Sequence, residues 1–97
     1  MVMEFLPEAT EEAAEAVSSY EASEPGLGVR FRAELESASA AIVQQPLLWR
    51  ERHGLYRRAN LPGFPYYVAH CVRGQRLLIA AVAHTSRPPG YWKKRLP

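Results

Sequence analysis

The sequence predicts a small α+β domain of order β-α-α-β-β-β, a helical hairpin packed on one face of a small twisted antiparallel sheet. Two segments with helical spacing of apolar residues lie in the first half of the chain, and three strand-like runs follow in the second half. Short links rich in Gly and Pro join these elements, which favours antiparallel neighbours. The 97 residues allow one domain over 1–97, and their 47% apolar content suits a modest core.

The N-terminal part predicts a short strand and then a helix. Residues 1–6 form the strand, which Pro7 ends. Thr10 is the expected N-cap of a helix over 10–23, because Glu11-Glu12 in its first turn favour the positive end of the helix dipole. The apolar side chains of this segment recur at helical spacing: Ala13, Val17 and Tyr20.

The second helix has the clearer apolar stripe. Its members are spaced by three or four residues: Leu27, Phe31, Leu35, Ala38 and Ile42. Pro46 ends this helix, and the short link at Pro25-Gly26 predicts that the two helices form an antiparallel hairpin.

Three strands complete the domain. The alternating run 55–61 is followed by a turn at Pro62-Gly63 and by the aromatic and β-branched run 66–72. Arg73-Gly74-Gln75 then makes a tight connection to the apolar run 76–83. Strands joined in this way form an antiparallel meander.

Charge is divided unevenly along the chain. Residues 1–49 contain two arginines and nine glutamates, a net charge of −7, whereas residues 50–97 contain ten Lys or Arg and one Glu, a net +9. This asymmetry favours a polyanionic partner for the basic half. The alternative is two solvated faces of one protein.

Several classes of site are not expected. Cys71 is the only cysteine and lies in an apolar run, so we expect no disulfide, an inert buried thiol and a cytoplasmic location. The acidic N-terminal segment lacks a signal peptide, and no apolar run is long enough for a membrane. His53, His70 and His84 are far apart, so no metal and no cofactor are predicted. Gly26-Leu27-Gly28 is a turn rather than a phosphate-binding loop.

Four motifs carry a resemblance to a known family. They are the hairpin with Tyr20, Pro25-Gly26-Leu27-Gly28, Phe31 and Leu35, then Tyr56-Arg57-Arg58, then Phe64-Pro65-Tyr66, and the ending 81–95. In this order the chain resembles the RelE/ParE superfamily, the toxins of bacterial type II toxin–antitoxin pairs. The resemblance implies the fold above and a partner, an antitoxin whose C-terminal segment wraps the toxin. An acidic segment would suit the basic half.

The superfamily has two activities, both of which inhibit growth. RelE-like members cleave mRNA in the ribosomal A site, and ParE-like members poison DNA gyrase. RNA cleavage without a metal needs a base, an acid and cations for the phosphate. If the chain is RelE-like, Tyr91 stands where that branch carries its catalytic Tyr, His84 serves as base or acid, and Arg87 holds phosphate.

Departures from the nuclease pattern favour ParE-like action on gyrase. Ribosome-dependent members begin the second strand of the meander with a catalytic Arg, where this chain has Tyr66 and Tyr67. Their lysine-rich preceding strand is reduced here to Arg57 and Arg58. Against this, ParE-like members often carry an acidic residue after the tail Arg, where this chain has Pro88-Pro89-Gly90. The alternatives are a RelE-like endonuclease and a non-toxic basic binding module.

Four residues are predicted to contact the target: Arg57, Arg58, Trp92 and Arg95. Because Arg57 and Arg58 alternate along one strand, they point to opposite faces and do not share one site. Trp92 either stacks on a base or anchors the tail on the sheet. Arg95 either binds the target or pairs with a helix glutamate. His70 alternates with apolar side chains and is expected to be a hydrogen-bonded core residue.

Overall fold

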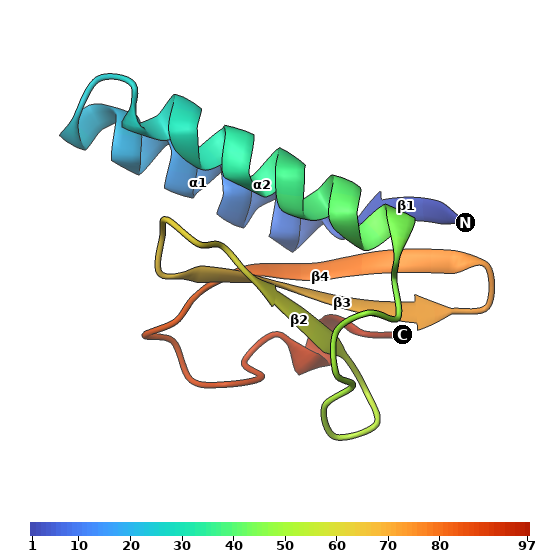
Figure 1. Cartoon of the computed structure of the whole chain (residues 1–97). Helices are drawn as coiled ribbons and strands as arrows, with labels where there is room; N and C mark the ends of the chain where they lie inside the picture. The colour runs from blue at the N-terminus through green and yellow to red at the C-terminus, as the bar shows by residue number, and fades with distance from the viewer.

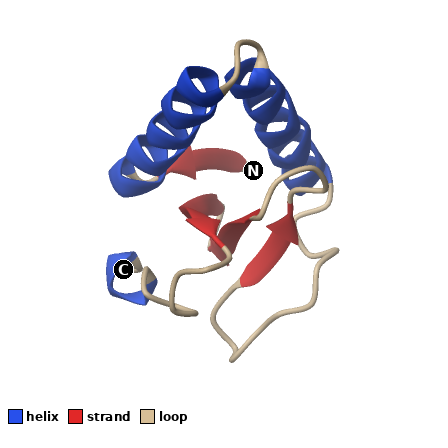
Figure 2. Cartoon of the chain, turned by 90° about the vertical axis from the view of Figure 1, so that its left-hand side faces the viewer, coloured by secondary structure: helices blue, strands red, loops and turns tan.

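The computed structural model describes all 97 residues and confirms the predicted order of elements (Figure 1). The elements are β1 (Val2–Phe5), α1 (Pro7–Ser23), α2 (Leu27–Gln44), β2 (Arg57–Asn60), β3 (Tyr66–Arg73), β4 (Arg76–His84) and a 3₁₀ turn, η1 (Lys93–Arg95). Both helices lie on one face of the sheet, and the C-terminal tail lies on the other (Figure 2). Neither helix has the length and apolarity needed to cross a membrane.

The sheet has the strand order β1-β4-β3-β2. The predicted antiparallel meander is present in β2, β3 and β4, whereas β1 adds a parallel edge beside β4. The parallel edge arises because the helical hairpin carries the chain from one edge of the sheet to the other. As a result the first strand lies beside the last.

Helix α1 begins earlier than the sequence predicted. The expected N-cap at Thr10 is wrong: Pro7 occupies the first turn, and the Thr10 amide already donates a helical hydrogen bond to the Leu6 carbonyl at 3.1 Å. Proline suits this position because it lacks an amide hydrogen that the first turn would leave unpaired.

The helical hairpin depends on two glycines. Gly26 takes a φ of +91°, which a residue with a side chain rarely adopts. Gly28 lies where a Cβ atom would meet the carbonyl oxygen of Val17, so the missing side chain lets the helices approach closely. The Glu21 carboxylate accepts hydrogen bonds from both glycine amides, at 2.8 and 2.9 Å, and caps α2.

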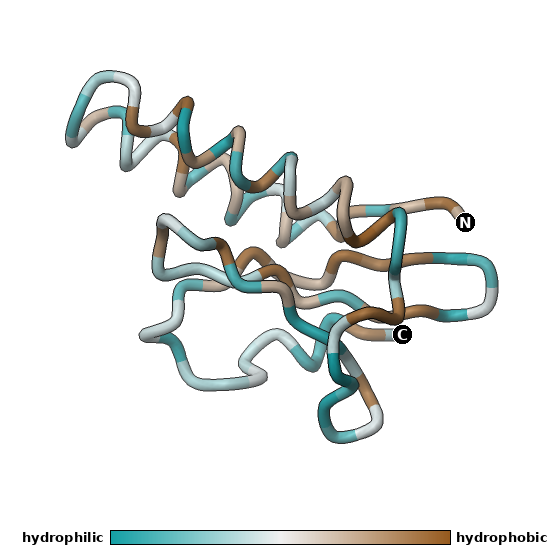
Figure 3. Tube along the Cα trace, viewed as in Figure 1, coloured by the Kyte–Doolittle hydropathy of each residue, from teal (hydrophilic) through white to brown (hydrophobic).

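The main core fills the space between the helices and the sheet. The predicted stripe of α2 supplies Phe31, Leu35 and Ile42, all buried, and hydrophobic residues run along β4 (Figure 3). The main core also contains four aromatic rings in edge-on or stacked contact: Tyr20, Phe31, Phe64 and Tyr66.

A second cluster lies on the opposite face of the sheet, under the tail. Its buried members are Tyr56, Tyr67, Ala69, Ala80, Ala81, Ala83 and Trp92. The pairing of β3 with β4 skips Ala80, since Ala69 faces Ala81 and His70 faces Ile79. This bulge puts two successive small residues on the tail side, which leaves room for Trp92.

Candidate functional site

The tail 85–97 is held on the sheet by Trp92. Its indole is fully buried, its Nε1 donates to the Tyr67 hydroxyl at 3.2 Å, and its ring meets that of Tyr56 edge-on at 4.5 Å. Trp92 is therefore the anchor that the sequence offered as one alternative. Because the side chain of Trp92 has no exposed surface, it cannot contact a target while the tail is in this conformation. The expectation that Trp92 contacts the target is therefore not supported.

The carboxylate of Glu12 is the centre of the tail contacts. Arg95 donates to it through Nη1 at 2.9 Å and Nη2 at 3.0 Å, and the Tyr91 hydroxyl also donates to it. The Val82 amide donates a further bond at 3.1 Å, and the Arg87 guanidinium lies 3.9 Å away. We call these five residues the Glu12 cluster.

The cluster forms beside the part of β4 that extends beyond its pairing with β1, which covers Arg76–Ile79. The last bond to the N-terminal strand region runs from the Leu6 amide to the Ile79 carbonyl. Beyond it, Glu12 accepts the Val82 amide, and Arg95 donates to the Ala80 carbonyl at 3.1 Å. Side chains thus satisfy backbone groups that would otherwise remain unpaired at a partly buried edge.

Electrostatics fix the protonation of the cluster. Burial raises the pKa of Glu12, but the bonds from Arg95, Tyr91 and Val82 outweigh it, so the pKa is lowered and the carboxylate is charged. Burial and the bond to Glu12 raise the pKa of Tyr91 well above its ordinary value. The Arg87 guanidinium also lies 3.8 Å above the Tyr91 ring. Tyr91 is therefore a neutral donor at physiological pH.

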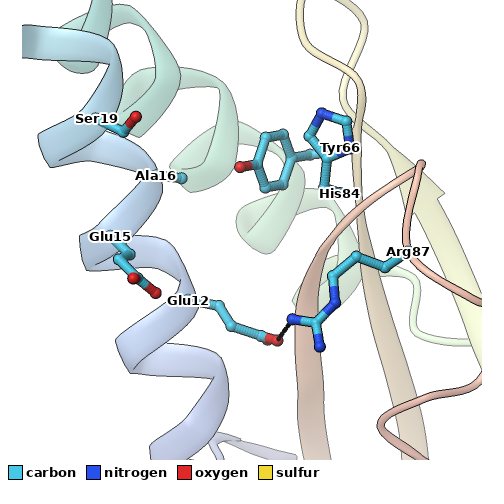
Figure 4. A pocket seen from close by; sticks show the side chains of 7 residues that line it. All are labelled: Glu12, Glu15, Ala16, Ser19, Tyr66, His84 and Arg87. Carbon is cyan, nitrogen blue, oxygen red and sulfur yellow. Dashed lines mark ion pairs between the residues drawn. The ribbon is translucent and has the colours of Figure 1, made fainter.

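An open pocket of about 250 Å³ adjoins the cluster, between α1 and the end of β4 (Figure 4). Its lining residues are Glu12, Glu15, Ala16, Ser19, Tyr66, His84 and Arg87. His84 accepts a bond from the Ser86 amide at Nδ1, at 3.0 Å, and its ring meets that of Tyr66 edge-on at 5.0 Å. This bond makes Nδ1 an acceptor and leaves Nε2 as the nitrogen that can donate.

The predicted site residues fall in different places. His84 and Arg87 line the pocket, whereas Tyr91 and Arg95 bind Glu12. Arg95, expected to contact the target, is instead paired with a helix glutamate, the alternative the sequence left open.

Arg57 and Arg58 lie apart from the pocket and on opposite sides of the sheet, as their alternation predicted. Arg57 donates to the Trp49 carbonyl at 2.7 Å, beside the main core. The Arg58 guanidinium lies 3.9 Å above the ring of Tyr67, in the second cluster, and donates to the Asn60 side chain.

Sequence reasoning missed Glu12 as the organising residue. One signal was present: Glu12 is three residues after Ala9 and four before Ala16, the two buried residues of α1. That spacing directs its side chain toward the sheet rather than into solvent.

Two buried titratable groups lie outside the cluster. His70 is fully buried, as its alternation with apolar side chains predicted, and its ring lies edge-on to Trp49 at 5.5 Å. Neither ring nitrogen has a hydrogen-bond partner of good geometry, and the backbone groups of Val68 and Pro46 act on the ring only as weak partners. Burial chiefly lowers the pKa of His70, and it raises the pKa of the buried Cys71 thiol. No group of three His, Cys, Asp or Glu side chains is placed to hold a metal ion.

No family model matches the sequence, and no curated protein matches it. The structure is nevertheless similar to a solved structure described as the chromosomal ParDE TA system from P. aeruginosa, with a TM-score of 0.73 and 15% identity. The match covers 87% of this chain and 95% of that chain, and at this identity it is a likeness of fold. The chain therefore has the RelE/ParE-like fold that its sequence motifs predicted.

Proposed function

We propose that the chain is the toxin of a bacterial type II toxin–antitoxin system and inhibits growth by ParE-like action on DNA gyrase. The observation that carries the proposal is the fold shared, over nearly the whole chain, with a chain of a ParDE system. The proposed partner is an antitoxin whose acidic C-terminal segment covers part of the basic half. The site of action is then the cytoplasm, where gyrase works.

The state of Tyr91 supports gyrase over RNA cleavage as the target. A general acid or base must exchange a proton with the substrate during the reaction. Here the Tyr91 hydroxyl is half-buried and donates to Glu12, with the Arg87 guanidinium over its ring. Its raised pKa further opposes proton release. In this arrangement Tyr91 holds the tail on α1.

Two aromatic residues support the same choice. Tyr66 and Tyr67 stand near the position where the nuclease branch carries a catalytic Arg. Tyr66 packs on Phe31 with ring centroids 5.0 Å apart, and Tyr67 accepts the indole bond of Trp92. Both side chains therefore have packing roles on their two faces of the sheet.

A RelE-like endonuclease remains the second candidate because of the pocket beside the Glu12 cluster. His84 and Glu15 supply groups that can exchange protons, and Arg87, with 53% of its side chain exposed, can approach a phosphate. These three residues are the ones to substitute if the chain cleaves RNA.

The proposal is tested by inducing the chain alone in bacterial cells and following growth and pulse-labelled synthesis. Gyrase poisoning stops DNA synthesis first, whereas mRNA cleavage stops protein synthesis first. The proposal predicts growth arrest with early loss of DNA synthesis. Unaffected growth, with no complex formed with the product of the neighbouring gene, would instead favour a non-toxic basic binding module.

A further inference from the structure

The basic half of the chain contains many cations without an acidic partner. Of its ten Lys and Arg residues, three lie within 4.0 Å of a carboxylate: Arg76, Arg87 and Arg95. The other seven have no such partner: Arg50, Arg52, Arg57, Arg58, Arg73, Lys93 and Lys94. Their charge is therefore available to a ligand.

Four of these cations surround the second cluster, and we call them the basic face: Arg52, Arg58, Lys93 and Lys94. Arg52 is bonded through its backbone to Tyr56, with N–H to carbonyl at 2.7 Å, and Arg58 stacks on Tyr67. Lys93 and Lys94 follow Trp92 directly and are exposed. Trp92 contacts both Tyr56 and Tyr67, so the segments that carry these cations lie together on the tail side of the sheet (Figures 1 and 2).

This face lies opposite the acidic layer of the molecule. All nine glutamates of residues 1–49 lie on β1, on the two helices or at the link between them, and Glu51 is the one acid in the rest of the chain. The tail and the loop before β2 lie on the far side of the sheet from the helices (Figures 1 and 2). The separation gives one negative and one positive side, so an approaching polyanion is oriented toward the basic face.

We propose that the basic face binds the phosphate backbone of duplex DNA. The cations are distributed around the face rather than gathered in one pocket, which suits a row of phosphates. Arg58 is held in place by the Tyr67 ring and by the uncharged Asn60 side chain. No carboxylate neutralises its charge, and its guanidinium has further N–H groups that can donate to a phosphate. The inference rests on the proposed function, because gyrase is bound to DNA as it works.

The test measures binding of the purified full chain to a fluorescent duplex of random sequence by anisotropy, over a range of salt concentrations. Contacts with four phosphates predict a slope of log K against log salt of about −3.6. We expect Arg58→Ala to weaken binding and reduce the slope by about 1, and K93A/K94A to reduce it by about 2. Arg30→Ala removes the same charge from an exposed residue of α2 and should leave the slope unchanged.

A conservative variant separates charge from stacking. Arg58→Lys keeps the charge, so the slope should persist while affinity falls several-fold. The melting temperature of each variant is also measured. Slopes are compared only among variants whose melting temperature equals that of the unchanged chain.

Four outcomes would overturn the inference: no duplex binding at low salt, an Arg30→Ala effect equal to that of Arg58→Ala, binding of a Glu-rich peptide that Arg58→Ala weakens while duplex binding is unchanged, or tighter binding of single-stranded RNA. The peptide result would assign the face to a protein partner, and the RNA result would favour the endonuclease. Growth arrest without duplex binding would refute the inference alone, whereas absence of growth arrest would refute the proposed function whatever the anisotropy shows.

Discussion

The carboxylate of Glu12 and the guanidinium of Arg95 form a two-bond ion pair, at 2.9 and 3.0 Å, across 83 residues of sequence. Arg95 also donates to the Ala80 carbonyl, and Glu12 accepts the Val82 amide. The pair therefore joins the first helix, the bare edge of β4 and the tail. Because both side chains are mostly buried, with 14% and 16% exposed, the pair is shielded from solvent.

Replacing Glu12 should destabilise the fold. In Glu12→Gln the guanidinium of Arg95 loses its counter-charge in a partly buried site, and the expected cost is about 3 kcal/mol, the lower end of the range for buried pairs, because both side chains keep some exposure. The free energy of unfolding is measured by denaturant titration. Glu15→Gln, one turn away at an exposed position, is the matched control and should change stability by less than about 0.5 kcal/mol. Equal stability of the two variants would show that the cluster does not hold the tail.

Acid should weaken the fold through the same carboxylate. The folded-state pKa of Glu12 is lowered, so its contribution is complete above the unfolded value of about 4.3 and is lost as pH falls toward the folded value. Stability measured between neutral pH and about pH 3 should decline more steeply in the unchanged chain than in Glu12→Gln. Parallel curves would refute the assignment of this acid sensitivity to Glu12.

His70 should produce a second pH dependence nearer neutrality. Its folded-state pKa is lowered by burial, with the charge of Arg57 acting in the same direction, so below about 6.5 the unfolded state binds more protons. Stability therefore falls as pH drops through that value. His70→Phe, which removes two unpaired ring nitrogens, should match the unchanged chain at pH 7 to within about 1 kcal/mol and exceed it at pH 5.

The exposed His53 provides the control for His70. His53→Gln should retain the full decline in stability between neutral and mildly acidic pH. A His70→Phe chain that loses stability over the same range would mean that some other group titrates there.

Much of the fold was predictable because it depends on local patterns. The stripe containing Phe31, Leu35 and Ile42 predicted the buried face of α2, and the apolar run 76–83 predicted the last strand of the meander, which is β4. The start of α1 was misplaced because Thr10 has the properties of an N-cap while Pro7 is equally suited to the first turn.

The site was harder to predict because its contacts join distant segments. Four of the five glutamates of α1, Glu8, Glu11, Glu12 and Glu15, look alike in sequence, and the path of the tail decides which one meets Arg95. The parallel pairing of β1 likewise depends on where the helical hairpin returns the chain. The alternation of side chains along β2 is a local property, so it was predictable that Arg57 and Arg58 point to opposite faces of the sheet.

Tyr91→Phe separates the two candidate activities in cells. The variant loses the hydroxyl bond to the charged carboxylate of Glu12, while Arg95 still holds that carboxylate, so we expect a loss of about 2 kcal/mol in stability. A gyrase toxin should therefore still arrest growth when Tyr91→Phe is induced. Loss of both growth arrest and mRNA cleavage in a folded variant would instead assign Tyr91 to catalysis.

ParE-like action is tested by adding the purified chain to DNA gyrase and measuring supercoiling of relaxed plasmid. The same preparation is added to translating ribosomes, and cleavage of their mRNA in the A site is measured as the comparison. We expect supercoiling to be inhibited and the mRNA to stay intact. Cleaved mRNA with unaffected supercoiling would rule out ParE-like action on gyrase.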